Sequence, residues 1–184
     1  MKKELKNYLL SVARKAIADE LEISFGEPVE PDGHDAELTE KTGVFVTLEI
    51  NGRLRGCIGN ILPVYPLFEA VRKNAVNAAF EDPRFMPLEP EEFDDVEIEI
   101  SVLSVPKKLS YKNSGDLLKK LRPGIDGVIL KKGYYEATYL PQVWGDLHDK
   151  EEFLSSLCVK AGMDSGEWKK GGVTVSIYEV EAFR

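Results

Sequence analysis

The sequence predicts an α+β fold with largely antiparallel sheet, and three observations support that class. The dipeptide Asn51-Gly52 separates two β-rich runs and favours a two-residue type I′ turn. Apolar residues recur at helical spacing in residues 2–21 and 67–79. Strand and helix patterns do not alternate in the regular order that produces a parallel sheet. We therefore expect hairpins that pack against helices.

The first half of the chain is expected to contain two helices and one hairpin. Leu5, Leu9 and Val12 lie on one side of the first, amphipathic helix. An acidic, proline-containing segment without periodicity follows and is expected to be a loop. The first helix is expected at residues 2–21 and the loop at residues 27–41. The two paired strands are expected at residues 44–50 and 53–58. The second helix is expected at residues 67–79 and ends before Asp82-Pro83.

The second half is expected to add strands and one helix. Val96, Ile98 and Ile100 alternate with polar residues, which is typical of a half-buried strand. Lys132-Gly133 separates two further β-rich runs, and Gly162 follows an apolar helical stripe. These patterns predict strands at residues 96–102, 127–131, 134–140 and 173–180, and a helix at residues 153–161.

The composition is that of a soluble globular protein. Of 184 residues, 43% are hydrophobic and 30% are charged, enough to bury a sizeable core in one domain or two small lobes. No apolar run approaches the ~18 residues that span a bilayer, and the N-terminus lacks the features of a secretory signal. Only Cys57 and Cys158 are present, too few for a disulfide scaffold. We expect a cytoplasmic protein with reduced thiols and no membrane association.

The charge distribution disfavours nucleic-acid binding, with one exception. The net charge of −8 repels nucleic acid and anionic membranes. Residues 106–132, however, carry eight basic residues against two acidic ones; the basic residues are Lys107, Lys108, Lys112, Lys119, Lys120, Arg122, Lys131 and Lys132. This basic stretch is either a solvated face or an anion- or RNA-binding surface, although no interleaved aromatic platform accompanies it.

The hexapeptide at residues 54–59, Leu-Arg-Gly-Cys-Ile-Gly, is the strongest candidate for a functional site. A regular strand would place Arg53, Arg55 and Cys57 on one face. Leu54 and Ile58 would occupy the opposite face. A nearby cation stabilises the reactive thiolate form of a cysteine. Cys57 is therefore a candidate nucleophile or ligand-gripping residue, or else a small buried hydrophobic residue.

Gly56 and Gly59 flank Cys57 and remove side-chain bulk from the strand. They would let a ligand or another backbone approach closely, and Gly59 would allow a sharp exit with positive φ. The alternative is that both glycines serve a bulge or a helix crossing.

The hexapeptide resembles the signature of the AMMECR-type domain family. Other segments resemble further blocks of that family in the same order, at residues 78–85, 98–104, 124–130, 137–143 and 153–162. The resemblance covers nearly the whole chain, so residues 1–184 are expected to form a single AMMECR-type domain.

The resemblance implies two lobes with a cleft between them, the larger lobe containing both termini and the smaller one inserted. It implies a functional motif formed by Leu54, Arg55, Gly56, Cys57, Ile58 and Gly59, with Asp82 and Arg84 as secondary candidates and Gln142 beside the cleft. The turn chemistry of Asp82-Pro83-Arg84, a helix end followed by a rigid turn, favours a local salt bridge between Asp82 and Arg84 over a ligand role. Bacterial and archaeal family members commonly accompany Memo-type and radical S-adenosylmethionine proteins, which are therefore candidate partners. The resemblance implies no reaction.

Residues for catalysis or metal binding are sparse. Cysteine catalysis needs an oriented base, and only His34 and His148 supply imidazole. His148 precedes Asp149 where bacterial members of the resembled family have Pro-Asp, which argues against a shared Cys57–His148 pair. Two cysteines and two histidines form no zinc or cluster pattern, and no nucleotide-binding motif is present. We expect no metal or cofactor.

The sequence supports three functional hypotheses. The first is a ligand- or partner-binding accessory module of a modification system, with Arg55 as an anion clamp near Cys57. The second is a cysteine-dependent enzyme that acts on a small molecule or macromolecule, with Cys57 catalytic. The third is an RNA-associated protein that uses residues 106–132.

Overall fold

The computed structural model describes residues 1–33 and 35–184. The chain divides into two compact units: unit 1 comprises Met1–Leu103 and Glu181–Arg184, and unit 2 comprises Ser104–Val180. Each unit has one four-stranded sheet and its own hydrophobic core, so the α+β prediction is confirmed. Within the described residues, no helix is long and apolar enough to cross a membrane.

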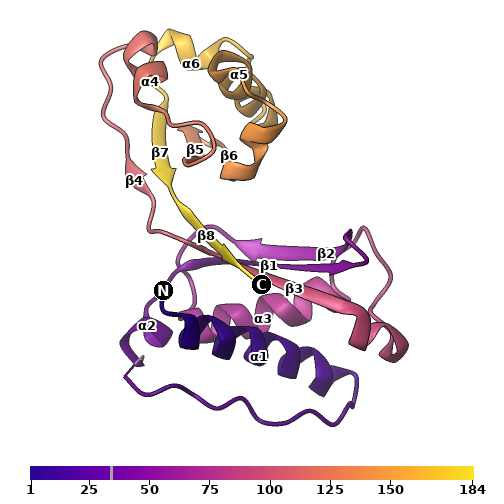
Figure 1. Cartoon of the computed structure of the whole chain (residues 1–184). Coiled ribbons are helices and arrows are strands. Elements are labelled where there is room, and N and C mark those ends of the chain that lie inside the picture. The colour runs from indigo at the N-terminus through magenta and orange to yellow at the C-terminus, as the bar shows by residue number, and fades with distance from the viewer. Residues whose placement is uncertain (34) are drawn as a thin grey trace. The chain divides into compact units, whose positions relative to one another are not determined.

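Unit 1 is a sheet covered on one face by helices α1 and α3 (Figure 1). The strand order is β2-β1-β3-β8, which leaves β2 at one edge. Its elements are α1 (Lys3–Glu20), α2 (Asp35–Thr39), β1 (Gly43–Ile50), β2 (Arg53–Asn60), α3 (Leu67–Phe80), the 3-10 helix η1 (Pro90–Asp95), β3 (Val96–Leu103) and β8 (Val180–Phe183).

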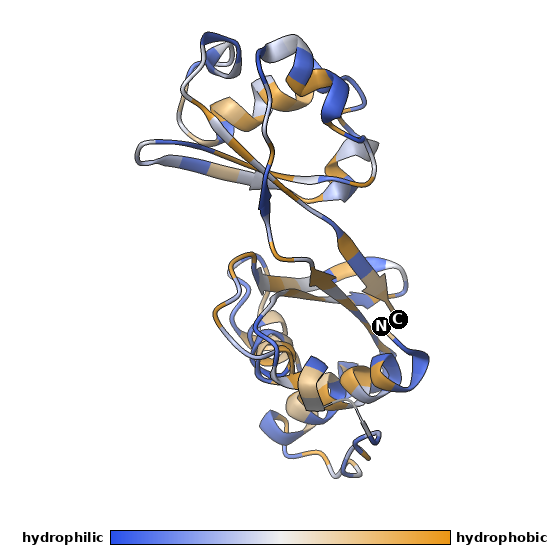
Figure 2. Ribbon diagram, turned by 90° about the vertical axis from the view of Figure 1, so that its left-hand side faces the viewer, coloured by the Kyte–Doolittle hydropathy of each residue, from blue (hydrophilic) through white to orange (hydrophobic). Residues whose placement is uncertain are grey.

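The core of unit 1 follows from the predicted periodicities. Leu5, Leu9 and Ile17 on α1 are fully buried, as are Val46 and Leu48 on β1. Figure 2 shows polar and apolar residues mixed along the helices of both units, as expected where one side of each helix is buried. The two predicted helices of this half are confirmed.

The predicted hairpin between β1 and β2 is also confirmed. Asn51 and Gly52 have φ values of 53° and 71°, the paired positive values that a type I′ turn requires. The pairing contains one irregularity, because Leu48 pairs with Gly56 whereas Glu49 pairs with Leu54. Arg55 is therefore the extra residue of a β-bulge.

Unit 2 has an antiparallel sheet of order β4-β7-β5-β6. In its core the rings of Trp144 and Phe153 stack with centroids 3.6 Å apart, and Cys158 is fully buried as predicted. Its elements are β4 (Lys107–Lys108), α4 (Ser114–Lys120), β5 (Gly127–Lys132), β6 (Tyr135–Tyr139), the 3-10 helix η2 (Pro141–Gly145), α5 (Lys150–Lys160), α6 (Glu167–Lys170) and β7 (Thr174–Tyr178).

Several sequence predictions need correction. The predicted loop at residues 27–41 contains the short helix α2. The predicted strand at residues 173–180 is broken at Glu179, and β7 and β8 belong to different sheets. The short helix α4 was missed although Asn113 caps it, its side chain accepting a hydrogen bond from the backbone nitrogen of Asp116.

Candidate functional site

The bulge at Arg55 changes which side chains of β2 share a face. Cys57 pairs with Thr47 and Leu54 pairs with Glu49, so Cys57 and Leu54 lie on the same face of the sheet. Ile58 pairs with Val46, whose side chain is buried in the core. The prediction that Arg53, Arg55 and Cys57 share a face is therefore wrong, because the extra residue reverses the alternation.

Arg55 connects β2 to η1 and to the segment before it. Its Nε and Nη2 donate to the Glu92 carboxylate at 2.8 and 2.9 Å, and its Nη1 and Nη2 donate to the carbonyls of Met86 and Pro87 at 3.0 and 3.2 Å. The hydrogen bonds to Glu92 are the main cause of the raised pKa of Arg55. Four of its five N–H groups are thus engaged, which leaves Arg55 poorly suited to clamp an anion.

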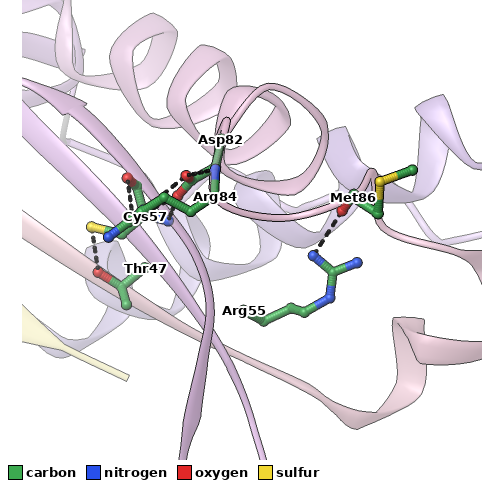
Figure 3. A network of polar contacts seen from close by, with 6 residues as sticks. All are labelled: Thr47, Arg55, Cys57, Asp82, Arg84 and Met86. Carbon is green, nitrogen blue, oxygen red and sulfur yellow. Dashed lines mark hydrogen bonds and ion pairs between the residues drawn. The ribbon is translucent and has the colours of Figure 1, made fainter.

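Figure 3 shows the Arg55 side chain directed toward Met86 and away from Cys57. A surface groove of about 530 Å³ runs beside it at the turn end of the hairpin, lined in part by Arg53, Leu54 and Glu92. Of the two strand arginines, Arg53 is the exposed one.

The cation beside Cys57 is Arg84, which a buried carboxylate holds in place. Asp82, with its side chain only 2% exposed, binds Nε and Nη2 of Arg84 at 2.9 and 2.6 Å. The same carboxylate accepts hydrogen bonds from the backbone nitrogens of Cys57 at 2.8 Å and of Arg84 at 3.1 Å. The bonds from the Arg84 side chain, followed by those from the two backbone amides, hold the pKa of Asp82 well below its usual range.

Arg84 keeps part of its guanidinium available. Its side chain is 54% exposed, and Nη2 also donates to the carbonyl of Cys57 at 3.4 Å. Hydrogen bonding to Asp82 is the main cause of its raised pKa, and the charge interaction with Cys57 adds to it. Among the described residues, Nη1 of Arg84 has no hydrogen-bond partner. Asp82 and Arg84 thus form the predicted salt bridge and also present a cation next to Cys57 (Figure 3).

The salt bridge also covers the open edge of the sheet. Strand β2 is an edge strand, and the backbone N–H and C=O of Cys57 point away from β1. Asp82 accepts from that N–H and Arg84 donates to that C=O, as a neighbouring strand would do. The pair therefore blocks strand addition at Cys57.

The sulfur of Cys57 lies on the face of the sheet opposite the helices. It is half-buried, and the hydroxyl of Thr47 donates to it at 3.3 Å. Sequence reasoning missed Thr47, because a regular hairpin would pair Cys57 with Val46, and only the bulge at Arg55 brings Thr47 directly across from Cys57. Leu54, on the same face, is 42% exposed.

Packing explains both glycines of the hexapeptide. A Cβ on Gly56 would lie 2.0 Å from the carbonyl oxygen of Ala78 on α3, so this glycine permits the helix crossing. A Cβ on Gly59 would lie 2.3 Å from the ring of Phe45. Gly59 does not have positive φ, so the predicted sharp exit is wrong.

Other residues that the sequence singled out belong to unit 2. Gln142 and His148 are exposed residues of unit 2, whereas Cys57 belongs to unit 1. Trp144 is buried within unit 2, where its Nε1 donates to the carbonyl of Asp126 at 2.7 Å. His34 lies outside the described residues. Across residues 1–33 and 35–184, no three His, Cys, Asp or Glu residues are grouped as metal ligands.

Half of the basic residues in the 106–132 stretch are ion-paired. The pairs are Lys120 with Asp116, Arg122 with Asp126 and Glu179, Lys131 with Glu136, and Lys132 with Glu167. In the described chain, Lys107, Lys108, Lys112 and Lys119 have no ion-pair partner. The stretch is therefore not one continuous field of free cations.

Two antiparallel sheets with separate cores define this chain as a two-unit α+β protein, and an arginine–carboxylate pair after α3 contacts the edge strand of the first sheet. The chain belongs to the AMMECR1 family, since the family model described as AMMECR1 matches residues 10–183. This match confirms the resemblance found in the sequence.

Similar proteins of known sequence or structure match this chain over most of its length. A protein of Thermococcus gammatolerans is 42% identical over 192 residues, covering 100% of this chain and 91% of that protein. A protein of Methanothermobacter thermautotrophicus is 44% identical over 158 residues, covering 84% of this chain and 81% of that protein. The crystal structure of an uncharacterized protein, PH0010, from Pyrococcus horikoshii matches with a TM-score of 0.82 at 39% identity, covering 99% of this chain and 92% of that one.

Proposed function

We propose that this protein is a binding module that serves as an accessory component of a modification system, and that it holds an anionic group of a partner or ligand at Arg84 beside Cys57. The observation that carries the proposal is the half-exposed guanidinium of Arg84, which a buried carboxylate fixes against the backbone of Cys57. The sequence predicted Arg55 as the anion clamp, but Arg55 is engaged with Glu92 and two carbonyls. We therefore assign the role of anion clamp to Arg84.

Preorganisation favours binding at this position. An arginine side chain loses rotamer freedom when it grips a ligand, and that loss reduces affinity. Asp82 already restricts Arg84 in the free protein through two hydrogen bonds, while Nη1 points to no partner among the described residues. An incoming carboxylate or phosphate therefore finds a donor that is already oriented.

The candidate partners come from the family resemblance. Memo-type and radical S-adenosylmethionine proteins accompany family members in bacteria and archaea, so a physical complex with one of them is the form of the proposal that can be tested directly. The tagged protein would be co-expressed with the Memo-type and radical S-adenosylmethionine proteins of the same genome. Capture of either one is expected.

Matched arginine variants locate the contact. Arg84→Met should weaken capture about tenfold or more, since a truncated charge pair lowers affinity strongly. Arg53→Met removes an exposed arginine of strand β2, which also carries Cys57, and should leave capture unchanged. Because Arg84→Met leaves the Asp82 carboxylate buried without its counter-ion, the double variant Asp82→Asn/Arg84→Met should accompany it. Full capture by a folded variant that lacks Arg84 would refute the proposed site.

A cysteine-dependent enzyme is the second candidate. The hydroxyl of Thr47 donates a hydrogen bond to the Cys57 sulfur, and the guanidinium of Arg84 donates one to the Cys57 carbonyl, so a hydroxyl donor and a cation both contact this cysteine. Replacement of Cys57 by serine separates the two functions: an enzyme would lose its activity, whereas a binding module would retain capture of its partner.

A further inference from the structure

Unit 2 contains a groove of about 630 Å³ where strands β4 and β7 part. Lys107 and Lys108 pair with Ile177 and Ser176, and the backbone nitrogen of Leu109 donates to the carbonyl of Val175 at 2.8 Å. Beyond Leu109, no backbone hydrogen bond joins the two segments in the described chain. The groove lies between residues 108–114 and 168–175.

Every charged residue that lines this groove is a lysine, in a protein whose net charge is −8. The four are Lys108, Lys112, Lys169 and Lys170. Lys169 and Lys170 bind acidic residues outside the groove lining, whereas Lys108 and Lys112 have no ion-pair partner within the described residues. The groove therefore offers two ammonium groups without an ion-pair partner among the described residues, although the charge of Lys112 interacts with Asp116, and no residue that lines the groove is a carboxylate.

The backbone adds further donors at one wall. Gly171 and Gly172 have φ values of 87° and 76°, which only glycine adopts without strain. The carbonyl of Val173 accepts a 2.6 Å hydrogen bond from the hydroxyl of Tyr111. Val173 directly precedes β7, and extended backbone at that position would direct its N–H to the same side as that carbonyl. Within the described part of the chain, the N–H groups of Gly172 and Val173 have no acceptor.

We propose that this groove binds a small phosphate-bearing molecule of about nucleotide size. Free backbone N–H groups next to ammonium groups form the arrangement that proteins use to hold phosphate oxygens. A volume of about 630 Å³ is in the usual range for small-molecule sites.

A small ligand fits this groove better than single-stranded RNA. Stacking of bases needs exposed aromatic faces. Trp168 is buried, and Tyr111 is only partly exposed, with its hydroxyl donating a hydrogen bond to the carbonyl of Val173. The groove belongs to unit 2 and the Arg84 site to unit 1. A result that contradicts one proposal therefore leaves the other unaffected.

The test is a titration of the full-length protein with sodium pyrophosphate, followed by ¹H–¹⁵N NMR at 150 mM NaCl. We expect saturable shifts of the amide signals of Gly171, Gly172 and Val173. The variant Lys108→Ala/Lys112→Ala should weaken binding about tenfold or more. The control variant Lys107→Ala/Lys119→Ala removes the same charge from exposed lysines that do not line the groove, and should bind normally.

Three results would overturn the proposal. The first is the absence of saturable shifts at residues 171–173. The second is equal weakening in both double variants, which would indicate general attraction to positive charge. The third is tighter binding of a 12-nucleotide oligouridylate than of pyrophosphate, with dependence on all four mutated lysines, which would favour an RNA surface. Amide spectra of the unliganded variants establish that each remains folded.

Discussion

The buried carboxylate of Asp82 accepts a 2.8 Å hydrogen bond from the backbone nitrogen of Cys57 and at the same time holds the guanidinium of Arg84. One side chain thus connects the segment after α3 to the edge strand and holds the cation against the backbone of Cys57. The stability of this part of unit 1 and the properties of the site should therefore change together.

Replacement of Asp82 by alanine should destabilise the protein strongly. The substitution removes four hydrogen bonds, two of them from the charged guanidinium of Arg84. It also leaves the backbone N–H of Cys57 without its acceptor. Loss of such bonds should lower the free energy of unfolding by about 3 kcal/mol. Urea denaturation measures the change. A loss below about 0.5 kcal/mol would show that the carboxylate does not fasten the strand edge.

The contribution of Asp82 should also depend on pH. Folding lowers the pKa of this carboxyl, so the unfolded chain binds its proton more readily than the folded protein. The stabilisation is complete above the unfolded value of about 3.9 and is lost as the pH falls through the folded value. The difference in unfolding free energy between the native protein and Asp82→Asn should be constant from about pH 5 to pH 8 and shrink below about pH 4. A difference that grows in acid would contradict the assignment.

Arg55 should behave as a structural residue that lysine cannot replace. Its planar guanidinium binds the Glu92 carboxylate through two nitrogens and reaches two carbonyls. Arg55→Lys keeps the charge but loses the two-nitrogen geometry, so it should lower the free energy of unfolding by about 1–2 kcal/mol. Arg53→Lys, at an exposed position on the same strand, should change it by less than about 0.5 kcal/mol. Equal stability of the two lysine variants would show that the contacts of Arg55 contribute little.

Gly56→Ala should disrupt the contact between β2 and α3. The added methyl group would lie 2.0 Å from the backbone oxygen of Ala78, so strand and helix must separate. Overpacking of this kind lowers stability by about 1–3 kcal/mol. Gly26→Ala is the control in the same unit, because nothing lies within 4 Å of a Cβ at that position. Thermal denaturation of both variants would compare them, and a Gly56→Ala protein as stable as its control would contradict the packing explanation.

The sequence predicted those parts of the fold that local chemistry decides. Asn51-Gly52 specifies its turn because both residues tolerate positive φ, and the apolar period of α1 identifies its buried side. The strand prediction at residues 173–180 failed at Glu179, because β-rich residues continue on both sides of the break. Only the pairing of β7 and β8 with different sheets reveals the interruption.

The sequence predicted the segment that contains the candidate site, but it assigned the cation beside Cys57 to Arg55 instead of Arg84. Spacing along a regular strand associates Arg55 with Cys57, and the bulge that separates them depends on how β1 and β2 pair. Arg84 is 27 residues from Cys57 in the chain, and its approach depends on how the segment after α3 folds over the edge of the sheet. Neither relationship has a signal in local sequence, apart from the Asp-Pro-Arg turn that predicted a salt bridge at Asp82 and Arg84.

In the proposed function, Arg84, and not Arg55, presents positive charge to an anionic group next to Cys57. The most direct test is the ratio of the alkylation rates of Cys57 by iodoacetate and by iodoacetamide, in protein carrying Cys158→Ala. The exposure and ionisation of the thiol affect both reactions equally and therefore cancel in the ratio. The ratio thus reports how strongly the protein attracts the negatively charged reagent, iodoacetate. We predict that Arg84→Met lowers this ratio several-fold, while Arg55→Met and Arg53→Met leave it unchanged. A ratio that falls in Arg55→Met and not in Arg84→Met would contradict the account.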